Sequence, residues 1–233
     1  MPPLDPRLLL HGYASGVFPM ADSRDAADLF WVEPRERAIL PLDAIHVSRS
    51  LAKRLRSGDF RVTADRAFHD VVRACADRSE TWINPAIEGA VVALHAQRQA
   101  HSIEVWDAAD ELVGGLYGIR LGRAFFGESM FSRATDASKV ALAWLVARLR
   151  VGGFTLLDCQ FMTDHLASLG AVTVTRATYL RRLGEALAEG SSPPGDWSAL
   201  DAALAPETLP AAALPEDWGA SGKRITQLLG HTS

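Results

Sequence analysis

The fold is decided by the stretch "RAFFGESMFSRATDASKVALAWLVARLR", residues 123–150, together with "FTLLDCQ", residues 154–160. Its first part predicts a strand, Ala137 to Arg150 have the apolar spacing of a helix, and the last part predicts a second strand. Both strands end in polar groups, at residues 127–132 and 158–160. The sequence therefore raises the question whether these two ends share a site.

Elements on both sides of this stretch extend the same sheet. Two apolar runs flank residues 108–110 and predict a hairpin. The succession of elements indicates an α+β, or mixed α/β, fold with one central sheet. The other expected elements are helices at 8–16, 48–57, 67–78, 85–100, 163–170 and 178–190, strands at 60–65 and 171–176, and two short strands around Pro34.

Length and charge limit the classes of function. The 233 residues suffice for one large domain or for a medium and a small one, and the net charge of −4 means that nucleic acid needs a local basic face. Cys75 and Cys159 form neither a disulfide framework nor a metal motif, as expected in a reducing compartment. Without a signal peptide or an apolar spanning run, we expect a cytoplasmic protein with no membrane partner.

The polar ends of the two strands each allow two interpretations. Residues 127–132 are either a strand end with a surface carboxylate or the rim of a pocket, in which Glu128 would accept hydrogen bonds beside apolar Met130. Residues 158–160 either reach the surface or aim Asp158 and Gln160 at one point, because alternate strand residues share a face. Cys159 would face the other way and is expected to pack rather than to act as a nucleophile.

Basic and aromatic residues offer a second possible function. A basic cluster around one predicted helix is either a solvated face or a contact for RNA phosphates. Several aromatic rings are either core residues or platforms for unpaired bases. The cluster consists of Arg49, Lys53, Arg54, Arg56 and Arg61, and the aromatic set of Tyr13, Phe18, Trp31 and Trp82.

Several blocks in order resemble the leucyl/phenylalanyl-tRNA–protein transferase family. They are "LLLHGYASGVFPM", "TWI", "AHSIEVWD", "ELVGGLYGIRLGRAFFGESMFSR", "ASKVAL", and "LLDCQ" with "TDHLASLGA", between about Leu8 and Leu187. The resemblance implies transfer of Leu or Phe, and Met less well, from aminoacyl-tRNA to the α-amine of proteins that begin with Arg or Lys. Such transfer marks the acceptor for degradation by the N-end rule. No metal or organic cofactor is implied, and we expect a monomer.

The resemblance also implies a domain organisation. It predicts a small N-terminal domain, residues 1–45, and a catalytic domain resembling the GNAT acyltransferases, residues 46–190. From residue 191 the composition shifts to Pro, Ala, Glu and Asp, and we expect a weakly structured tail, residues 191–233. A few large residues could attach this tail to the body: Trp197, Leu204, Leu209 and Trp218.

Residue roles follow from the resemblance position by position. It assigns Asp158 and Gln160 to the catalytic centre, where they would act by positioning and electrostatics. Met20 stands where some relatives have a second stacking Trp. The aminoacyl pocket would be lined by Leu116, Glu128, Met130, Leu145 and Leu157, the 3′-terminal adenosine would be bound by Trp82, Met20, Tyr13 and Thr163, and the tRNA backbone by Arg49, Lys53, Arg54 and Arg56.

Two other functions compete with this interpretation. An acetyl-CoA-dependent N-acetyltransferase needs a pyrophosphate loop, and "RRLGEA", residues 181–186, matches the loop pattern formally, although the apolar spacing around Gly184 favours a helix. A non-catalytic RNA-binding module would explain the basic cluster and Trp82. It would not explain why Asp158 and Gln160 share a strand face.

Overall fold

The stretch at residues 123–160 folds as two neighbouring strands joined by a helix. In the computed structural model, which describes residues 3–188, 193–205 and 218–230, these are β7 (Ala124–Ser132), α5 (Ala137–Val151) and β8 (Leu156–Gln160). β7 and β8 pair in parallel, as a strand–helix–strand connection requires. The predicted elements of this stretch are confirmed.

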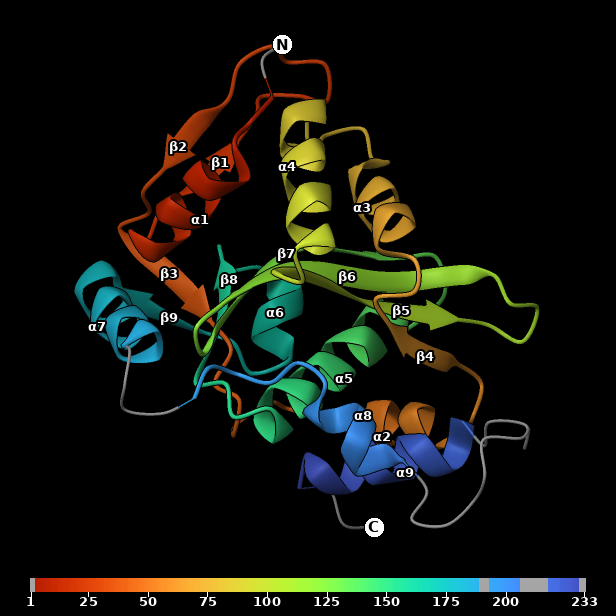
Figure 1. Ribbon diagram of the computed structural model, residues 1–233. Coiled ribbons are helices and arrows are strands. Elements are labelled where there is room, and N and C mark those ends of the chain that lie inside the picture. Colours follow the sequence, from red (N-terminus) through yellow and green to blue (C-terminus); the bar gives the residue numbers. More distant parts are fainter. Residues whose placement is uncertain (1–2, 189–192, 206–217, 231–233) are drawn as a thin grey trace.

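The described strands build one large sheet around this unit. It has seven strands in the order β4-β5-β6-β7-β8-β3-β9, and its pairs other than β7–β8 are antiparallel. The expected mixed α/β fold with a central sheet is therefore confirmed (Figure 1). The other strands are β3 (Glu36–Ile39), β4 (Arg61–Ala64), β5 (Ala100–Trp106), β6 (Leu112–Leu121) and β9 (Val172–Thr175).

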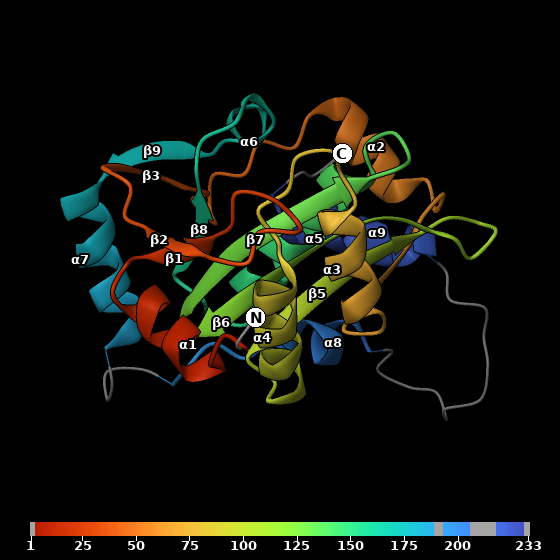
Figure 2. The same cartoon turned by 90° about the horizontal axis from the view of Figure 1, so that it is seen from above.

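Helices cover both faces of the sheet (Figures 1 and 2). On one face lie α1 (Pro6–Ala14), α3 (Phe68–Ala76) and α4 (Pro85–Ala96), whose buried residues form one apolar core with that face. On the other face, α5 and α2 (Arg49–Arg56) contribute to a second core. The central strands β5 to β8 are thus mostly buried on both sides, whereas the edge strand β9 is largely exposed. α6 (Asp164–Ser168) precedes β9, and α7 (Arg176–Leu187) follows it.

A second, small sheet lies beside α1. It pairs β1 (Phe18–Met20) with β2 (Phe30–Val32) in antiparallel register. The sequence predicted β2 but only a turn at Phe18. This sheet packs its inner residues against the core that α1, α3 and α4 share.

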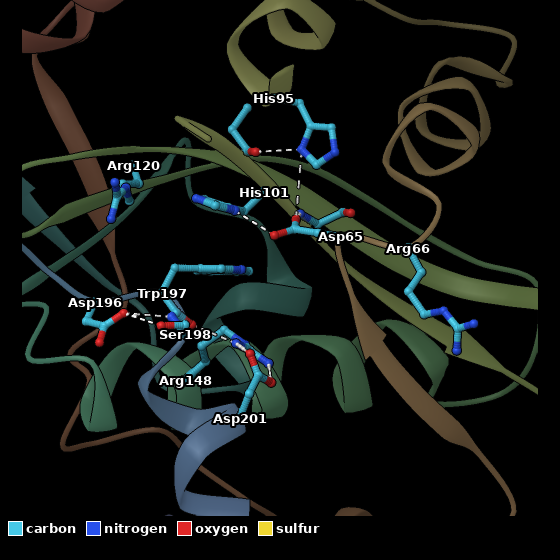
Figure 3. A network of polar contacts seen from close by, with 12 residues as sticks. Asp65, Arg66, His95, His101, Arg120, Arg148, Asp196, Trp197, Ser198 and Asp201 are labelled. Carbon is cyan, nitrogen blue, oxygen red and sulfur yellow. Dashed lines mark hydrogen bonds and ion pairs between the residues drawn. The ribbon is translucent and has the colours of Figure 1, made fainter. Parts of the chain in front are cut away.

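The C-terminal segment differs from the expected weakly structured tail. Its described parts include α8 (Ala199–Leu204) and α9 (Trp218–Leu228), while Leu209 lies outside the described residues. Trp197 is buried, with its ring stacked 4.3 Å from that of His101 and 5.4 Å from that of Phe125. Figure 3 shows the surrounding contacts, in which Arg148 binds Asp201 through two nitrogens. The expected weak structure is wrong for these described parts, whereas the expectation that large residues could attach the segment to the body is confirmed for Trp197 and Leu204.

The domain limits at residues 45 and 190 stay a prediction. β3 comes from the first of the proposed segments and lies in the large sheet between β8 and β9. Among the described residues, none of the helices combines the length and the hydropathy that a membrane span needs.

Candidate active site

The candidate site lies where β7 and β8 stop pairing. Their register covers residues 124–126 and 156–158 only, so the two strand ends beyond it are free to face other groups. Glu128 has no partner on β6, since Tyr117 pairs with Ser129 and Gly118 with Gly127. This bulge redirects the Glu128 side chain, a common device beside active sites. The two polar strand ends do share a site.

Asp158 is the most constrained residue of the site. Its carboxylate is 0% exposed and is paired with Arg37 of β3, itself 1% exposed. Arg37 Nε donates to Oδ1 at 2.9 Å and Nη2 to Oδ2 at 2.6 Å, a two-point geometry that is among the stronger ion pairs. The Tyr179 hydroxyl donates to Oδ2 at 2.9 Å, and the Gln160 main-chain N–H donates to Oδ1 at 2.9 Å.

Gln160 leaves the strand geometry at this point. Its φ of 60° is in the left-handed region, which residues other than glycine seldom adopt and which costs on the order of 1 kcal/mol or more. The Asp158 carboxylate holds its main-chain N–H, and the Gln160 side chain donates to Glu128 Oε1 at 2.7 Å. Strand alternation predicted that the Asp158 carboxylate and the Gln160 amide would project side by side toward one point. Instead, the Asp158 carboxylate binds the main-chain N–H of Gln160.

Glu128 is buried between Gln160 and Tyr13. Burial raises the pKa of the Glu128 carboxyl to about 8, and the charge of Asp158 adds to the rise, while the hydroxyl of Tyr13, the charge of Arg37 and the amide of Gln160 oppose it. The Tyr13 hydroxyl faces this carboxylate but lies outside hydrogen-bond geometry. A carboxyl with such a pKa exchanges its proton near neutral pH, which is what general acid–base chemistry needs.

An apolar cavity of about 50 Å³ lies on the α5 side of the same strand ends. Four of the five predicted pocket residues line it, namely Leu116, Met130, Leu145 and Leu157. Glu128 does not line it, because the bulge turns its side chain toward Gln160. Residues of the wall that the sequence interpretation did not include are Tyr117, Gly127, Ser129, Leu142, Cys159 and Leu166.

Other candidates near the strand ends have no catalytic geometry. Burial raises the pKa of the Cys159 thiol far above its usual range, and Asp158 adds to the rise, so Cys159 stays protonated and packs against the core. His165 lies in α6, with Nε2 buried and unpaired among the described residues. Residues 181–186 lie inside α7, so the formal pyrophosphate-loop motif is helical there.

The residues predicted to bind the adenosine differ in how open they are to a ligand. Trp82 and Met20 are partly buried and pack against the same core, and the Ala21 N–H bonds the Trp82 carbonyl at 3.2 Å. Tyr13 is only 1% exposed and packs at a tilt against the Phe126 ring, so its own ring is not open to a base in this conformation. The Thr163 hydroxyl caps α6 by accepting from Leu166 N–H at 3.2 Å.

The predicted phosphate contacts lie on α2, whose cap is Ser48; the sequence allowed either Ser48 or Ser50 in that position. Its apolar side is buried, and Arg49 and Lys53 are exposed. Arg54 pairs with Asp59 at 2.6 Å, and Arg61, beyond the helix, pairs with Asp110. Of the basic cluster, Arg49, Lys53 and the half-buried Arg56 are those for which no carboxylate partner is found in the described parts of the chain.

The site combines an apolar cavity with a buried carboxyl whose pKa is raised to about 8. Within the described ranges, no group of three or more His, Cys, Asp or Glu side chains is placed to hold a metal ion. The sequence interpretation missed Arg37 and Tyr179, which fix Asp158. Arg37 directly precedes the apolar run at residues 38–40, and this position at the start of a buried strand was the signal that could have pointed to it.

Known proteins similar to this chain agree on one family. Residues 39–184 match the family model described as leucyl/phenylalanyl-tRNA protein transferase, and residues 3–35 match the model of its N-terminal domain. A relative with that name from Cereibacter sphaeroides is 63% identical over 83% of this chain and 91% of its own. Another, from Rhizorhabdus wittichii, is 56% identical over the whole of both chains. The separate match of residues 3–35 confirms the expected small N-terminal domain.

The solved structure of L-PGS from Bacillus licheniformis is also similar, with a TM-score of 0.40 and 14% identity, covering 70% of this chain and 55% of that one.

Proposed function

Since the chain belongs to the leucyl/phenylalanyl-tRNA–protein transferase family and is therefore an aminoacyltransferase, we propose that it moves Leu or Phe, and Met less well, to the α-amine of proteins that begin with Arg or Lys. Transfer of aminoacyl groups from tRNA to proteins follows from the family. The choice of donor and acceptor is our proposal. The observation that carries it is the apolar cavity at the ends of β7 and β8, with a wall that includes Leu116, Met130, Leu145 and Leu157.

The cavity favours apolar side chains because burying a charged or polar one there costs several kcal/mol without a partner. At about 50 Å³, the cavity is smaller than the roughly 150 Å³ that holds a benzene ring, so an aminoacyl side chain must displace part of the wall. Met130 has an unbranched and flexible side chain, so it can move to admit Leu or the larger Phe. Discrimination among apolar side chains is modest, about 10- to 200-fold per methylene. This agrees with a donor preference that includes Leu, Phe and, less well, Met.

The reaction needs little beyond positioning. The neutral α-amine of the acceptor attacks the ester carbonyl carbon, the C–N bond forms, and the C–O bond to the terminal ribose breaks. The nitrogen loses one proton, and the ribose oxygen leaves as a hydroxyl after taking one up. An α-amine has a pKa near 7.7–8.0, so roughly a tenth is neutral at pH 7. Holding the amine against the ester supplies most of the acceleration.

Each polar residue of the site has a distinct part in this scheme. The Gln160 amide orients the attacking amine. Glu128 accepts the proton, because its pKa of about 8 nearly matches that of the amine and makes the transfer almost thermoneutral. Asp158 touches neither reactant and fixes the main chain of Gln160 through its N–H. Arg37 and Tyr179 in turn fix Asp158.

The tRNA is proposed to contact two regions. Trp82 and Met20 would hold the terminal adenosine, and Arg49, Lys53 and Arg56 would contact phosphates, with Arg54 contributing when its pair with Asp59 opens. Transfer of Leu or Phe would mark the acceptor for degradation by the N-end rule, in the cytoplasm, by a monomeric enzyme. The acetyl-CoA alternative loses its one motif, since Gly184 lies within α7.

A transfer assay tests the donor and acceptor together. The protein is mixed with tRNA carrying radiolabelled Leu, Phe, Met, Asp or Lys, and with matched peptides that begin with Arg, Lys or Ala. We expect product from Leu and Phe, less from Met, and only with the Arg and Lys peptides. Equal transfer from all five tRNAs would contradict the pocket assignment. Acetylation of the same peptides with acetyl-CoA would support the rival function.

A further inference from the structure

Large apolar side chains lie exposed around the candidate site. Phe30 on β2 is 46% exposed, and Phe161, directly after Gln160, is equally so. Single exposed apolar residues are ordinary surface, so what decides is where Phe30 lies relative to the reaction centre. The assigned roles of the site residues do not include Phe30.

The register of the small sheet fixes the face to which Phe30 belongs. Met20 pairs with Phe30, Phe18 with Val32, and Pro19 with Trp31. Directly paired residues project from the same face, with Cβ atoms about 4.5–5.5 Å apart, and the next pair along projects from the other face. Phe30, Met20 and Phe18 therefore share one face, and Trp31 is on the opposite face.

The two faces have different neighbours. The Trp31 ring covers Gly12 of α1 so closely that a Cβ at that glycine would lie 2.2 Å from a ring carbon. On the other face, the Phe18 ring lies 4.5 Å from the guanidinium carbon of Arg37 and 5.5 Å from the ring of Phe161. The face that carries Phe30 is therefore turned toward the catalytic network, and the Trp31 face is turned toward α1.

Trp82 adjoins the same end of the small sheet. The Ala21 N–H, next to Met20, donates to the Trp82 carbonyl at 3.2 Å. Arg24 Nη1 donates to the carbonyl of Ile83, the next residue, and ties the loop after β1 to the same segment. Trp82, Met20 and Phe30 thus come from neighbouring stretches of chain, and two of the three carry an aromatic ring.

We propose that Phe30 is an aromatic wall of the subsite for the terminal adenine of the tRNA, and that it supplies the flat surface that the thioether of Met20 lacks. This inference rests on the proposed function. A purine stacks on aromatic faces whatever its edge pattern, and each such contact is worth about 1–3 kcal/mol in single-stranded nucleic acids. A half-exposed ring on the same face as Met20, at the end of the small sheet that Trp82 adjoins, matches that chemistry. The ester of the aminoacyl group is attached to this same nucleoside.

Steady-state kinetics separate this role from a merely structural one. We expect Phe30→Ala to raise the KM for Leu-tRNA about tenfold, with kcat and the KM for an Arg-initiated peptide unchanged. Phe30→Leu, which keeps bulk but not the ring, should show most of the loss. Phe30→Trp should keep or lower the KM. Val172→Ala is the matched control, because Val172 is 43% exposed on β9, away from the small sheet.

A rescue variant and a minimal ligand complete the experiment. Met20→Trp combined with Phe30→Ala should recover donor affinity, because position 20 pairs directly with position 30. Binding of adenosine 5′-monophosphate, followed by ligand-observed NMR, should weaken in Phe30→Ala and recover in the double variant. This readout stands even if no transfer is found from Leu-tRNA, a result that would refute only the proposed function. Unchanged nucleotide binding and donor KM would overturn the inference. A raised peptide KM alone would assign Phe30 to the acceptor protein and overturn it too.

Discussion

At the scale of single residues, the chemistry of the site depends on which of its two carboxylates can exchange a proton. A carboxylate offers about four lone-pair positions. The Asp158 carboxylate accepts four hydrogen bonds: two from Arg37, one from the Tyr179 hydroxyl and one from the Gln160 main-chain N–H. Glu128 receives one hydrogen bond, from the Gln160 amide. In the proposed mechanism, Glu128 is therefore the carboxylate with room for a substrate proton, and Asp158 positions the main chain of Gln160.

Gln160→Ala tests the orienting role of the amide. Removing one preorganised polar group typically lowers kcat by about 10²–10³, and we expect a loss of that order with the KM for Leu-tRNA unchanged. Single-turnover transfer with saturating aminoacyl-tRNA measures it. Cys159→Ala is the control and should stay largely active, because the Cys159 thiol is protonated and packs against the core. An inactive Cys159→Ala variant, with an acyl-protein formed by wild type from Leu-tRNA alone, would contradict direct attack.

Glu128→Gln should change the pH dependence of folding. The unfolded pKa of Glu is about 4.3, whereas burial raises it to about 8 in the folded protein, so the folded state binds more protons between these values. The contribution of Glu128 to stability is thus present below about pH 4 and is lost as pH rises toward 8. The variant should match wild type at about pH 4.5 and exceed it by about 2–5 kcal/mol at pH 9.

Urea unfolding at several pH values between about 4.5 and 9 measures this difference. Glu111→Gln is the matched control, since Glu111 is exposed and outside the site. A gain that does not change with pH would mean that Glu128 ionises in the folded protein as it does in the unfolded one. In that case it could not be the proton acceptor near neutral pH.

The sequence predicted which residues lie at the site better than it predicted the contacts they make. Alternation along a strand placed Asp158 and Gln160 on one face, and both do lie at the site. The alternation could not predict that Gln160 would adopt a φ of 60°, or that a bulge would turn Glu128 out of the apolar cavity. Both departures depend on long-range partners, Arg37 in one case and β6 in the other. The alternation of residues along one strand carries no information about either of these partners.

At the scale of elements, α2 shows how one helix serves two purposes. Leu51, Ala52 and Leu55 bury its inner side. Gly222 of α9 approaches so closely that a Cβ there would lie 1.7 Å from the Leu55 carbonyl oxygen. With these contacts fixing the helix, Arg49 and Lys53 remain exposed. A rigid helix that presents cations in a fixed arrangement suits the backbone of a folded RNA.

Replacing Arg49 and Lys53 by Ala should weaken tRNA binding and reduce its salt dependence. Each lost phosphate contact lowers the slope of log K against log salt by about 0.7–0.9 units. Binding of uncharged tRNA at several salt concentrations measures the slope. Arg182→Ala, an exposed arginine on α7, is the matched control and should leave it unchanged. If the double variant keeps the wild-type slope, the RNA contacts another surface.

The periodic elements were the most predictable level of the structure. The hairpin of β5 and β6, the serine cap of α2 and the helix at Gly184 all followed from local patterns. The position of β3 was not predictable from such patterns. It pairs with β8, more than a hundred residues later in the chain, and no local feature of "ERAI" predicts which strand it pairs with.

At the scale of the whole molecule, the C-terminal segment closes the face of the sheet that α5 covers. Trp197, Leu200, Ile225 and Leu229 belong to the core of that face. The segment was expected to be weakly structured because Pro, Ala and charged residues dominate its composition. Composition averages over residues, whereas docking depends on a few large side chains at the right spacing. The apolar cavity shares this core, so the segment supports the body on which the site is built.

Trp197→Ala should therefore reduce global stability without altering the chemistry. The ring lies between His101 and Phe125, with the guanidinium of Arg148 5.0 Å from its centre. Its removal leaves a large cavity, and we expect the free energy of unfolding to fall by about 3–5 kcal/mol. Trp197→Phe keeps a ring and should lose less. Urea unfolding measures stability, and transfer of Leu well below the melting temperature should keep its wild-type kcat and KM. A loss below about 1 kcal/mol would mean that the segment docks too weakly to support the core. A fall in kcat with stability preserved would instead place Trp197 in contact with the reaction.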